Sequence, residues 1–380
     1  MSLPENFCLA PFHRFQISNN KCGPCSYKAN VWDIKNRSIK EFWNDRELQE
    51  LRQSFLDNKK HNLCHLCWKE EESGHSSLRQ RLNNFRKSDN ISKAIEKYIV
   101  NGDYKKFPKV LSVIPGNQCN LACKICIPDA SSKLNSELKT YPANFMLQPI
   151  QNWNMSDNEY ADIVNHSEHI QRIELYGGEP FYNKKNRTQL IDKIIQRGTS
   201  KNITLYFNTN CTVYDHDFMD TLSKQFKKVE IRASIDGINE QYEYLRYGGK
   251  YKEVMENSKK FYDLDNSDFQ IISTISLWNF LYLDDYYDEF CNKYKYSVRW
   301  NLVSDTDYLL LHQLPEQAKK LVDLSERFKF VESHIKLTPS DPIAWKKFTI
   351  FTKIQDKQRK SSMKDTFPKF YELTKNHGFD

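Results

Sequence analysis

The sequence lacks any run of about 18 or more apolar residues, the length that a membrane-spanning helix needs. Its first residues, Met1 to Asn6, also lack the basic segment and apolar stretch of a secretory signal. No internal repeat or low-complexity tract is evident. These absences argue against a membrane protein and a secreted protein, and we expect a folded protein of the cytoplasm.

Basic residues do not gather in any one part of the chain. The 56 lysines and arginines outnumber the 49 acidic residues and give a formal net charge of +7, but the two signs are interspersed, as in residues 69–72. There is no arginine-rich tract and no motif of interleaved aromatic residues. The composition therefore favours a solvated, lysine-rich surface over a groove that binds nucleic acid.

Cysteine, in contrast, is plentiful and unevenly spaced. Five of the ten cysteines lie at positions 8, 22, 25, 64 and 67, three lie within residues 119–126, and Cys211 and Cys291 stand alone. A chain of 380 residues needs no disulfide bonds to fold, and nothing marks this one as secreted. Thiols at two- and three-residue gaps in a reducing compartment indicate metal sites.

From Val110 onward, short apolar runs alternate with helical patterns. We predict strands over residues 110–114, 173–176, 203–207, 229–235, 271–275 and 297–303, with helices between them. This alternation predicts an α/β fold whose sheet is parallel, with right-handed crossovers. Residues 1–75 look irregular apart from a helix near 39–56, and residues 76–107 look like a helix or linker. Two helical stretches are expected near the end, at 315–330 and 345–360.

Polar or glycine-rich segments follow each of the first four predicted strands. These segments are Gly116 to Cys119, Gly177 to Pro180, Asn208 to Asn210, and Asp236 with Gly237. Because the carboxyl ends of parallel strands open at one face of such a fold, ligands bind there. We therefore expect the four segments to converge on a single mouth.

Cys119, Cys123 and Cys126 form a C-x3-C-x2-C loop after the first of these strands. Thiolates are the ligands of iron–sulfur clusters, and a [4Fe–4S] cluster normally takes four. Three thiolates would leave one iron able to bind a substrate or cofactor, as a catalytic zinc ion keeps an open position. Spacing alone leaves two alternatives open, a zinc site completed by a distant His or Cys and three ordinary buried thiols.

The order of the motifs resembles the radical S-adenosylmethionine (SAM) superfamily. The residues that carry the resemblance are Cys119, Cys123 and Cys126, then Ser131-Ser132, Tyr176-Gly-Gly-Glu-Pro180, Ser234-Ile-Asp-Gly237 and Arg246. The family commonly has Asn-Gly where this chain has Asn210-Cys211. The resemblance implies a partial (β/α)6 barrel of parallel strands over residues 108–304, preceded by a linker or helix over 81–107 and followed by a helical extension over 305–380.

The resemblance also implies roles for individual residues. The open iron would chelate the amino and carboxylate groups of SAM. Gly177, Gly178 and Glu179 match the motif that receives the amino group, glycine lets the backbone approach closely, and Pro180 stiffens the turn. The polar positions around the ribose are Asn210, Ser234 and Asp236. Arg246 matches an arginine that pairs with the SAM carboxylate.

Members of the superfamily reduce the cluster with an external donor such as flavodoxin or ferredoxin and cleave SAM to a 5′-deoxyadenosyl radical. The radical abstracts hydrogen from a substrate, while the protein positions the reactive carbon and excludes solvent. Relatives act on peptides, carbohydrates and cofactor precursors, and the sequence leaves the substrate class open.

The N-terminal cysteines allow two interpretations. Cys22-x2-Cys25 and Cys64-x2-Cys67 form a zinc-ribbon pattern, which leaves Cys8 unused and suggests a zinc-stabilised module that binds nucleic acid or a partner protein. Residues 1–80 also resemble the twitch (half-SPASM-like) region of some radical SAM enzymes. That resemblance implies an auxiliary [4Fe–4S] cluster on Cys8, Cys25, Cys64 and Cys67, with the choice between Cys22 and Cys25 open.

Overall fold

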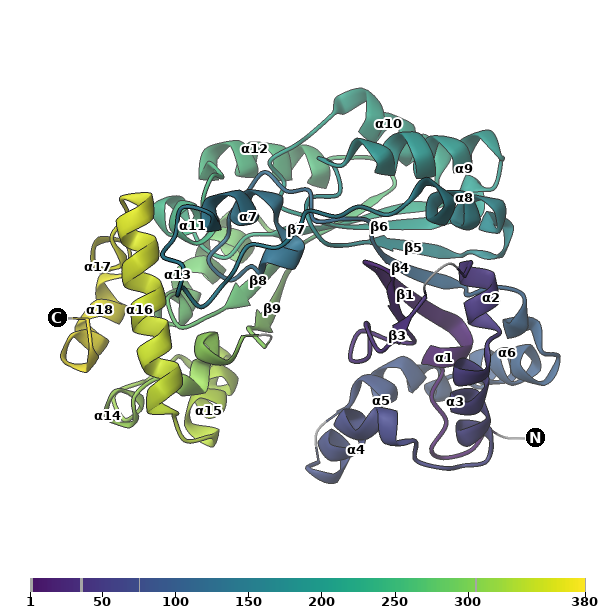
Figure 1. Ribbon diagram of the computed structural model, residues 1–380, viewed down its shortest axis with the longest axis horizontal. Coiled ribbons are helices and arrows are strands. Elements are labelled where there is room, and N and C mark those ends of the chain that lie inside the picture. The colour runs from purple at the N-terminus through teal and green to yellow at the C-terminus, as the bar shows by residue number, and fades with distance from the viewer. Residues whose placement is uncertain (1–2, 35–36, 75, 305, 380) are drawn as a thin grey trace. The chain divides into compact units, whose positions relative to one another are not determined.

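The computed structural model describes residues 3–34, 37–74, 76–304 and 306–379. Over these residues the chain is an α/β fold with a nine-stranded sheet in the order β3-β2-β1-β4-β5-β6-β7-β8-β9 (Figure 1). The predicted fold class is confirmed. The chain packs into two compact units: Met1–Gly116, Trp153–Phe207 and Asp220–Glu230 form the first, and Asn117–Asn152, Asn208–Met219 and Ile231–Asp380 form the second. The domain boundaries expected from the sequence stay a prediction.

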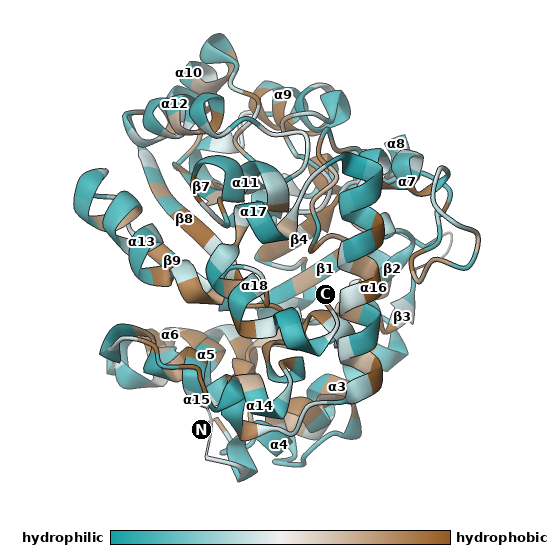
Figure 2. Ribbon diagram, turned by 90° about the vertical axis from the view of Figure 1, so that its left-hand side faces the viewer, coloured by the Kyte–Doolittle hydropathy of each residue, from teal (hydrophilic) through white to brown (hydrophobic). Residues whose placement is uncertain are grey.

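The six predicted strands are all present. They are β4 (Val110–Ile114), β5 (Arg172–Leu175), β6 (Thr204–Thr209), β7 (Lys228–Ser234), β8 (Ser267–Ile275) and β9 (Val298–Leu302). The pairs β4–β5, β5–β6 and β8–β9 are parallel, as expected. Figure 2 shows hydrophobic residues along β4 and β8, in line with strands that are buried in an α/β fold.

The N-terminal residues contain three further strands that the sequence analysis missed. These are β1 (Arg14–Ser18), β2 (Lys21–Gly23) and β3 (Trp32–Asp33). β1 runs parallel to β4, with Arg14 opposite Val110 and Ser18 opposite Ile114, while β2 and β3 continue the sheet in antiparallel fashion. The expectation that residues 1–75 are irregular is therefore wrong for this part. Only Phe15 and Ile17 carry the alternating apolar pattern, which is too short to stand out from sequence.

The helices before the core strands are α1 (Ala10–His13), α2 (Ile39–Trp43), α3 (Arg46–Leu56), α4 (His65–Glu72), α5 (Leu78–Leu82) and α6 (Asp89–Val100). The single helix expected near 39–56 is two helices. Asp45 interrupts it, because its side chain accepts a hydrogen bond from the Arg46 N–H and begins α3.

The helices between the core strands are α7 (Ser132–Leu138), α8 (Asp157–Asn165), α9 (Asp192–Gln196), α10 (His216–Gln225), α11 (Asn239–Leu245), α12 (Tyr251–Tyr262) and α13 (Leu283–Tyr287). π-helical segments, Asn186–Ile191 and Asp288–Lys293, adjoin α9 and α13. The chain turns after α9 at Gly198, whose φ of +76° is the left-handed conformation expected of a glycine that ends a helix.

The C-terminal extension contains α14 (Glu316–Lys319), α15 (Lys329–Leu337), α16 (Pro342–Arg359), α17 (Met363–Thr366) and α18 (Pro368–Thr374). The single helix expected over 315–330 is wrong, because this stretch holds α14, a short 3-10 turn over Glu326–Phe328 and the first residues of α15, with non-helical chain after α14. The helix expected over 345–360 is α16. Among the described residues, no helix is long and apolar enough to cross a lipid bilayer.

Ionic contacts tie β1 to the core strands of the first unit. Arg14 on β1 reaches Glu174 on β5 at 2.5 Å, and Ser112 on β4 donates to the same carboxylate at 2.6 Å. The Glu174 carboxylate is almost entirely buried, and burial in the absence of these donors would be costly. The contacts therefore hold the N-terminal strand in register with the core.

His13 makes the stability of this region depend on pH. Burial, with the nearby charges of Arg14 and Lys109, lowers the pKa of His13 from 6.5 to about 4. The folded chain keeps His13 neutral, so its contribution is fully present above pH 6.5 and is lost as the pH falls from 6.5 towards 4. We expect a loss of about 2 kcal/mol between pH 7.5 and pH 4.5, since the ring is partly exposed.

Urea unfolding of the wild type and of His13→Gln at both pH values measures this effect. The variant should lose less stability on acidification than the wild type, whereas His216→Gln, at an exposed position on α10, should behave like the wild type. Equal acid sensitivity in wild type and His13→Gln would contradict the prediction.

Candidate functional site

The loop between β4 and α7 brings three thiols together. The thiols of Cys119 and Cys123 act on Cys126 electrostatically, and their charges add to the burial that raises the pKa of Cys126. Burial also raises the pKa of Cys123. Buried thiols of this kind are protonated by themselves, and bound iron is what would deprotonate them. The donor set is therefore three sulfur atoms from one short loop, which suits an iron–sulfur cluster.

Two serines fix this loop at its start and its middle. Ser132 Oγ accepts from the Cys119 N–H at 3.1 Å and contacts the Cys119 carbonyl at 3.2 Å. Ser131 Oγ donates to the Leu121 carbonyl at 2.6 Å and caps α7. The Ser131-Ser132 pair singled out from sequence thus orders the backbone that carries the thiols, without itself supplying a ligand.

A buried ion pair lies beside Cys123. Arg246 Nη2 is 2.8 Å from Asp236 Oδ2, and Arg246 Nη1 is 3.9 Å from Cys123 Sγ. Asp236 Oδ1 accepts from the Thr274 N–H on β8 at 2.7 Å. Burial raises the pKa of Asp236, and the Arg246 guanidinium opposes that rise. The Nε atom of Arg246 is buried without a hydrogen-bond partner among the described residues, so it can still donate to a carboxylate ligand.

Asn210 follows the end of β6, and its side chain lies near Cys119, the first cysteine of the loop. Its Nδ2 atom is 3.9 Å from Cys119 Sγ and donates to Asn120 Oδ1 at 3.0 Å. The next residue, Cys211, has a φ of +59°, a conformation that favours glycine and explains why the family commonly has Gly here. The thiol of Cys211 is fully buried. Ser234, at the end of β7, donates to Asn208 Oδ1 at 3.4 Å.

The second unit thus brings together six of the predicted site residues: Cys119, Cys123, Cys126, Asn210, Asp236 and Arg246. Gly177 to Pro180 belong to the first unit. Gly177 and Gly178 have φ values of +67° and +55°, and a Cβ atom on Gly177 would lie 2.3 Å from Ile114 Cγ2. The turn therefore requires glycine at position 177, whereas the role of the Gly177–Pro180 segment in binding SAM stays a prediction.

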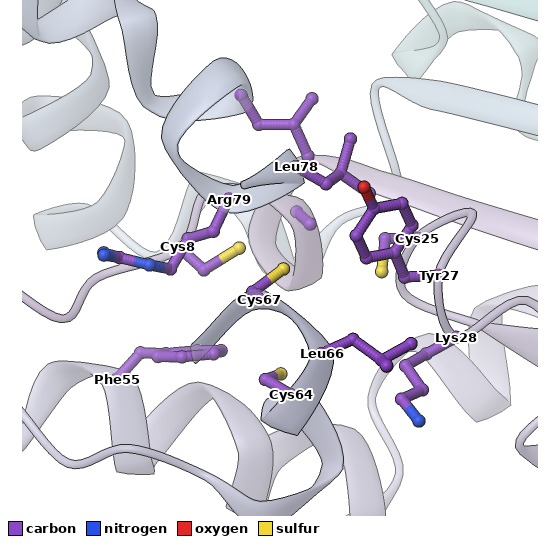
Figure 3. A pocket seen from close by; sticks show the side chains of 12 residues that line it. Cys8, Cys25, Tyr27, Lys28, Phe55, Cys64, Leu66, Cys67, Leu78 and Arg79 are labelled. Atoms are coloured by element: carbon purple, nitrogen blue, oxygen red, sulfur yellow. The ribbon is translucent and has the colours of Figure 1, made fainter. Parts of the chain in front are cut away.

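In the first unit, four N-terminal cysteines line one small cavity. Figure 3 shows the thiols of Cys8, Cys25, Cys64 and Cys67 around this common space. Burial raises the pKa of Cys8, and the charges of the other three thiols raise it further, which places all four within electrostatic reach. The remaining lining is largely apolar, with Phe55, Leu66, Leu78 and Leu82.

Cys22 does not line this cavity. It lies in β2 opposite Ile17 and is fully buried. Burial raises the pKa of Cys22 to about 12, and the charges that act on it belong to Arg37, Asp33 and other residues that are not cysteines. Cys25, after the end of β2, is the member of the pair that reaches the cavity.

The spacing of these thiols matters for the kind of metal site. Among the described residues, no three His, Cys, Asp or Glu side chains lie close enough to share a single metal ion. In a [4Fe–4S] cluster each thiolate binds its own iron, so its ligands stand farther apart than the ligands of one zinc ion. Which kind of metal site these four thiols form stays a prediction.

Arg79 joins the segments that carry these cysteines. Its Nη1 donates to the Glu5 and Phe7 carbonyls at 2.9 and 3.0 Å, just before Cys8. Its Nε and Nη2 contact the Glu71 carboxylate on α4 at 2.9 and 2.5 Å. Arg79 thus fixes the Cys8 segment against the helix that carries Cys67.

The segment that carries the three-cysteine loop resembles a known protein family. Residues 113–288 match the family described as the radical SAM superfamily. This segment, somewhat less than half of the chain, is therefore similar to radical SAM enzymes. The matched segment contains the three-cysteine loop, the glycine turn after β5 and the Asp236–Arg246 pair. No curated protein matches the chain in a sequence search.

Solved structures resemble the chain at low identity. Native anSMEcpe with bound AdoMet is 17% identical, with a TM-score of 0.42, and the match covers 71% of this chain and 63% of that one. Streptococcus suis SuiB bound to S-adenosylmethionine is 14% identical, with a TM-score of 0.37 and coverage of 97% and 75%. SuiB bound to its precursor peptide SuiA is 13% identical, with a TM-score of 0.37 and coverage of 82% and 66%. The chain thus spans less than two thirds of the anSMEcpe structure.

Two residues next to the three-cysteine loop were missed by the sequence analysis. They are Lys124, between Cys123 and Cys126, and Arg359 on α16. Arg359 donates to the Ala122 carbonyl, 237 positions away in the chain. No local sequence signal could have identified such a contact.

Proposed function

We propose that the enzyme holds an open-site [4Fe–4S] cluster through Cys119, Cys123 and Cys126 and uses it to cleave SAM. The observation that supports this proposal is the set of three thiols on one loop, with a buried arginine beside Cys123. When bound and reduced, the cluster supplies the electron that splits SAM into methionine and a 5′-deoxyadenosyl radical. The substrate that loses a hydrogen atom is a peptide, a carbohydrate or a cofactor precursor.

The residues around the loop orient SAM. Arg246 presents a buried Nε donor to the SAM carboxylate, and Asp236 keeps the guanidinium in place. Asn210 and Ser234 take the polar positions around the ribose, together with Asp236. Gly177, Gly178 and Glu179 receive the amino group and Pro180 stiffens the turn, an assignment that rests on the sequence resemblance alone.

We also propose a second [4Fe–4S] cluster on Cys8, Cys25, Cys64 and Cys67. Support comes from their common cavity and from their mutual electrostatic influence. This twitch-like site either accepts an electron from a product radical or anchors the substrate. An external donor such as flavodoxin or ferredoxin reduces the SAM cluster. All ten cysteines are free thiols, which supports a reducing, cytoplasmic location.

Anaerobic reconstitution with iron and sulfide tests the proposal. The full-length protein should become brown and hold about eight irons with matching acid-labile sulfide. Dithionite and SAM should then yield 5′-deoxyadenosine. A colourless protein that contains zinc, lacks sulfide and leaves SAM intact would instead support the zinc-stabilised binding module.

Two matched variants test which N-terminal cysteine is a ligand. Cys25→Ala should reduce the iron content from about eight towards four, because the auxiliary cluster loses one of its four thiolates. Cys22→Ala should keep about eight irons, since Cys22 lies in β2 away from the cavity. Iron and sulfide analysis after identical reconstitution measures both. Loss of iron from Cys22→Ala alone would assign the ligand to Cys22.

A further inference from the structure

The long C-terminal helix α16 reaches the backbone of the three-cysteine loop (Figure 1). In its last turn, Arg359 Nη2 donates to the Ala122 carbonyl at 2.7 Å. The same guanidinium makes a two-pronged contact with Glu137 on α7, at 2.8 and 2.9 Å. Arg359 therefore joins α16 to the residue immediately before Cys123 and to the helix that follows the loop.

The residue immediately after Cys123 is held by the same turn of α16. Lys124 is fully buried, and its Nζ lies 3.0 Å from Asp356 Oδ1. The ammonium group also lies 4.0 Å from the centroid of the Tyr244 ring and 5.9 Å from that of Trp278. Burial of a lysine is costly unless a charge and hydrogen bonds compensate, so Lys124 has little freedom to move away from Asp356.

Asp356 is itself fixed. Its Oδ2 accepts from the Met363 N–H at 2.7 Å, and its Oδ1 contacts Ser361 Oγ at 3.1 Å. On the other side of the loop, the amides of Ala122 and Lys124 donate to the carbonyls of Tyr247 and Leu245 at 3.0 and 2.8 Å. The segment around Cys123 is thus held from α16 through side chains and from the end of α11 through the backbone.

These contacts exceed what a simple structural cap requires. The apolar packing of α16, with Phe348 and Phe351 against Trp278, already covers this part of the second unit. A cap could leave Lys124 and Arg359 in solvent at no cost. Their burial on either side of Cys123 instead gives α16 a defined role in the geometry of the loop.

We infer that α16 is part of the cluster site, with Asp356 and Arg359 as positioning residues that fix the backbone on both sides of Cys123. Asp356 and Arg359 would keep the backbone of the three-cysteine loop in one conformation. This role rests on the proposed function, because the same loop is the proposed binding site of the cluster. The C-terminal extension is then required for the thiols to be presented in the right geometry.

Hydrogen exchange of the cluster-free, full-length protein tests the inference without depending on any iron chemistry. In Asp356→Asn and Arg359→Lys, the amides of Ala122 and Lys124 should exchange at least about tenfold faster than in the wild type. Arg359→Lys keeps the charge but loses the two-pronged contact, so it tests geometry in particular. The exposed neighbour variant Lys357→Met should exchange like the wild type.

A second readout uses the reconstituted protein. The two positioning variants should lose the iron of the SAM cluster faster during anaerobic chelator treatment, whereas the auxiliary cluster, in the first unit, should be lost at the wild-type rate. If α16 stays protected while the two loop amides exchange at the wild-type rate in both variants, α16 is only a cap and the inference fails. If Asp356→Asn does not fold, Arg359→Lys alone decides between these outcomes.

Discussion

Cys123→Ala is expected to abolish 5′-deoxyadenosine formation and to lower the iron content of the reconstituted protein from about eight to about four. Cys123 is the buried central member of the three-cysteine loop and the one beside Arg246. With two thiolates left, the loop can no longer hold a cluster that offers a single open iron. Chromatography of the SAM cleavage products and iron analysis measure the two effects.

The matched control for this variant is Cys291→Ala. Cys291 is a partly buried, isolated thiol in the π-helical segment after α13, and it belongs to neither cysteine group. This control should keep the full iron content and the wild-type rate of SAM cleavage. Wild-type cleavage by Cys123→Ala would show that the loop does not hold the reactive cluster.

Arg246→Met is expected to destabilise the protein by about 3–5 kcal/mol and to abolish SAM cleavage. The substitution leaves the Asp236 carboxylate buried without its counter-ion, since Arg246 is the cation that pairs with it. It also removes the free Nε donor that the proposed SAM carboxylate needs. Denaturant unfolding of the cluster-free protein reports the first effect and product analysis the second.

A double variant separates folding from function at this pair. In Arg246→Met/Asp236→Asn the buried charge is gone, while the asparagine carbonyl can still accept from the Thr274 N–H. Most of the lost stability should therefore return, whereas SAM cleavage should not. Recovery of both would assign Arg246 a purely structural role.

The core strands were predictable because each is a short apolar run that ends at glycine or a polar residue, as β4 does at Pro115-Gly116. The polar and glycine-rich segments that follow these strands could also be recognised in the sequence. Asn210 lies near Cys119, and Arg246 lies near Cys123 and Asp236, while their roles toward SAM stay predictions. The start of α3 at Asp45 could also have been recognised, because aspartate is a favoured helix cap.

The features that were missed depend on contacts between distant parts of the chain. β1 is too short to identify by its own pattern, and it becomes a strand by pairing with β4, which begins 96 positions after Arg14. The partner of Lys124 is Asp356, 232 positions away. Whether Cys22 or Cys25 faces the cavity depends on where β2 ends, since side chains alternate between the faces of a strand. Local sequence carries none of this information.

The parallel pairing of β1 with β4 has a consequence for how the enzyme is built. A cluster-binding module attached through a flexible linker could be removed or exchanged as a unit. Here the strand that leads from Cys8 towards Cys25 supplies the hydrogen-bonding neighbour of β4 along its whole length. Without it, β4 would become an exposed edge with unpaired amides, open to pairing with another molecule. The N-terminal region that carries the proposed auxiliary site and the core of the sheet are therefore one architectural element, and removing β1 would disrupt the sheet itself.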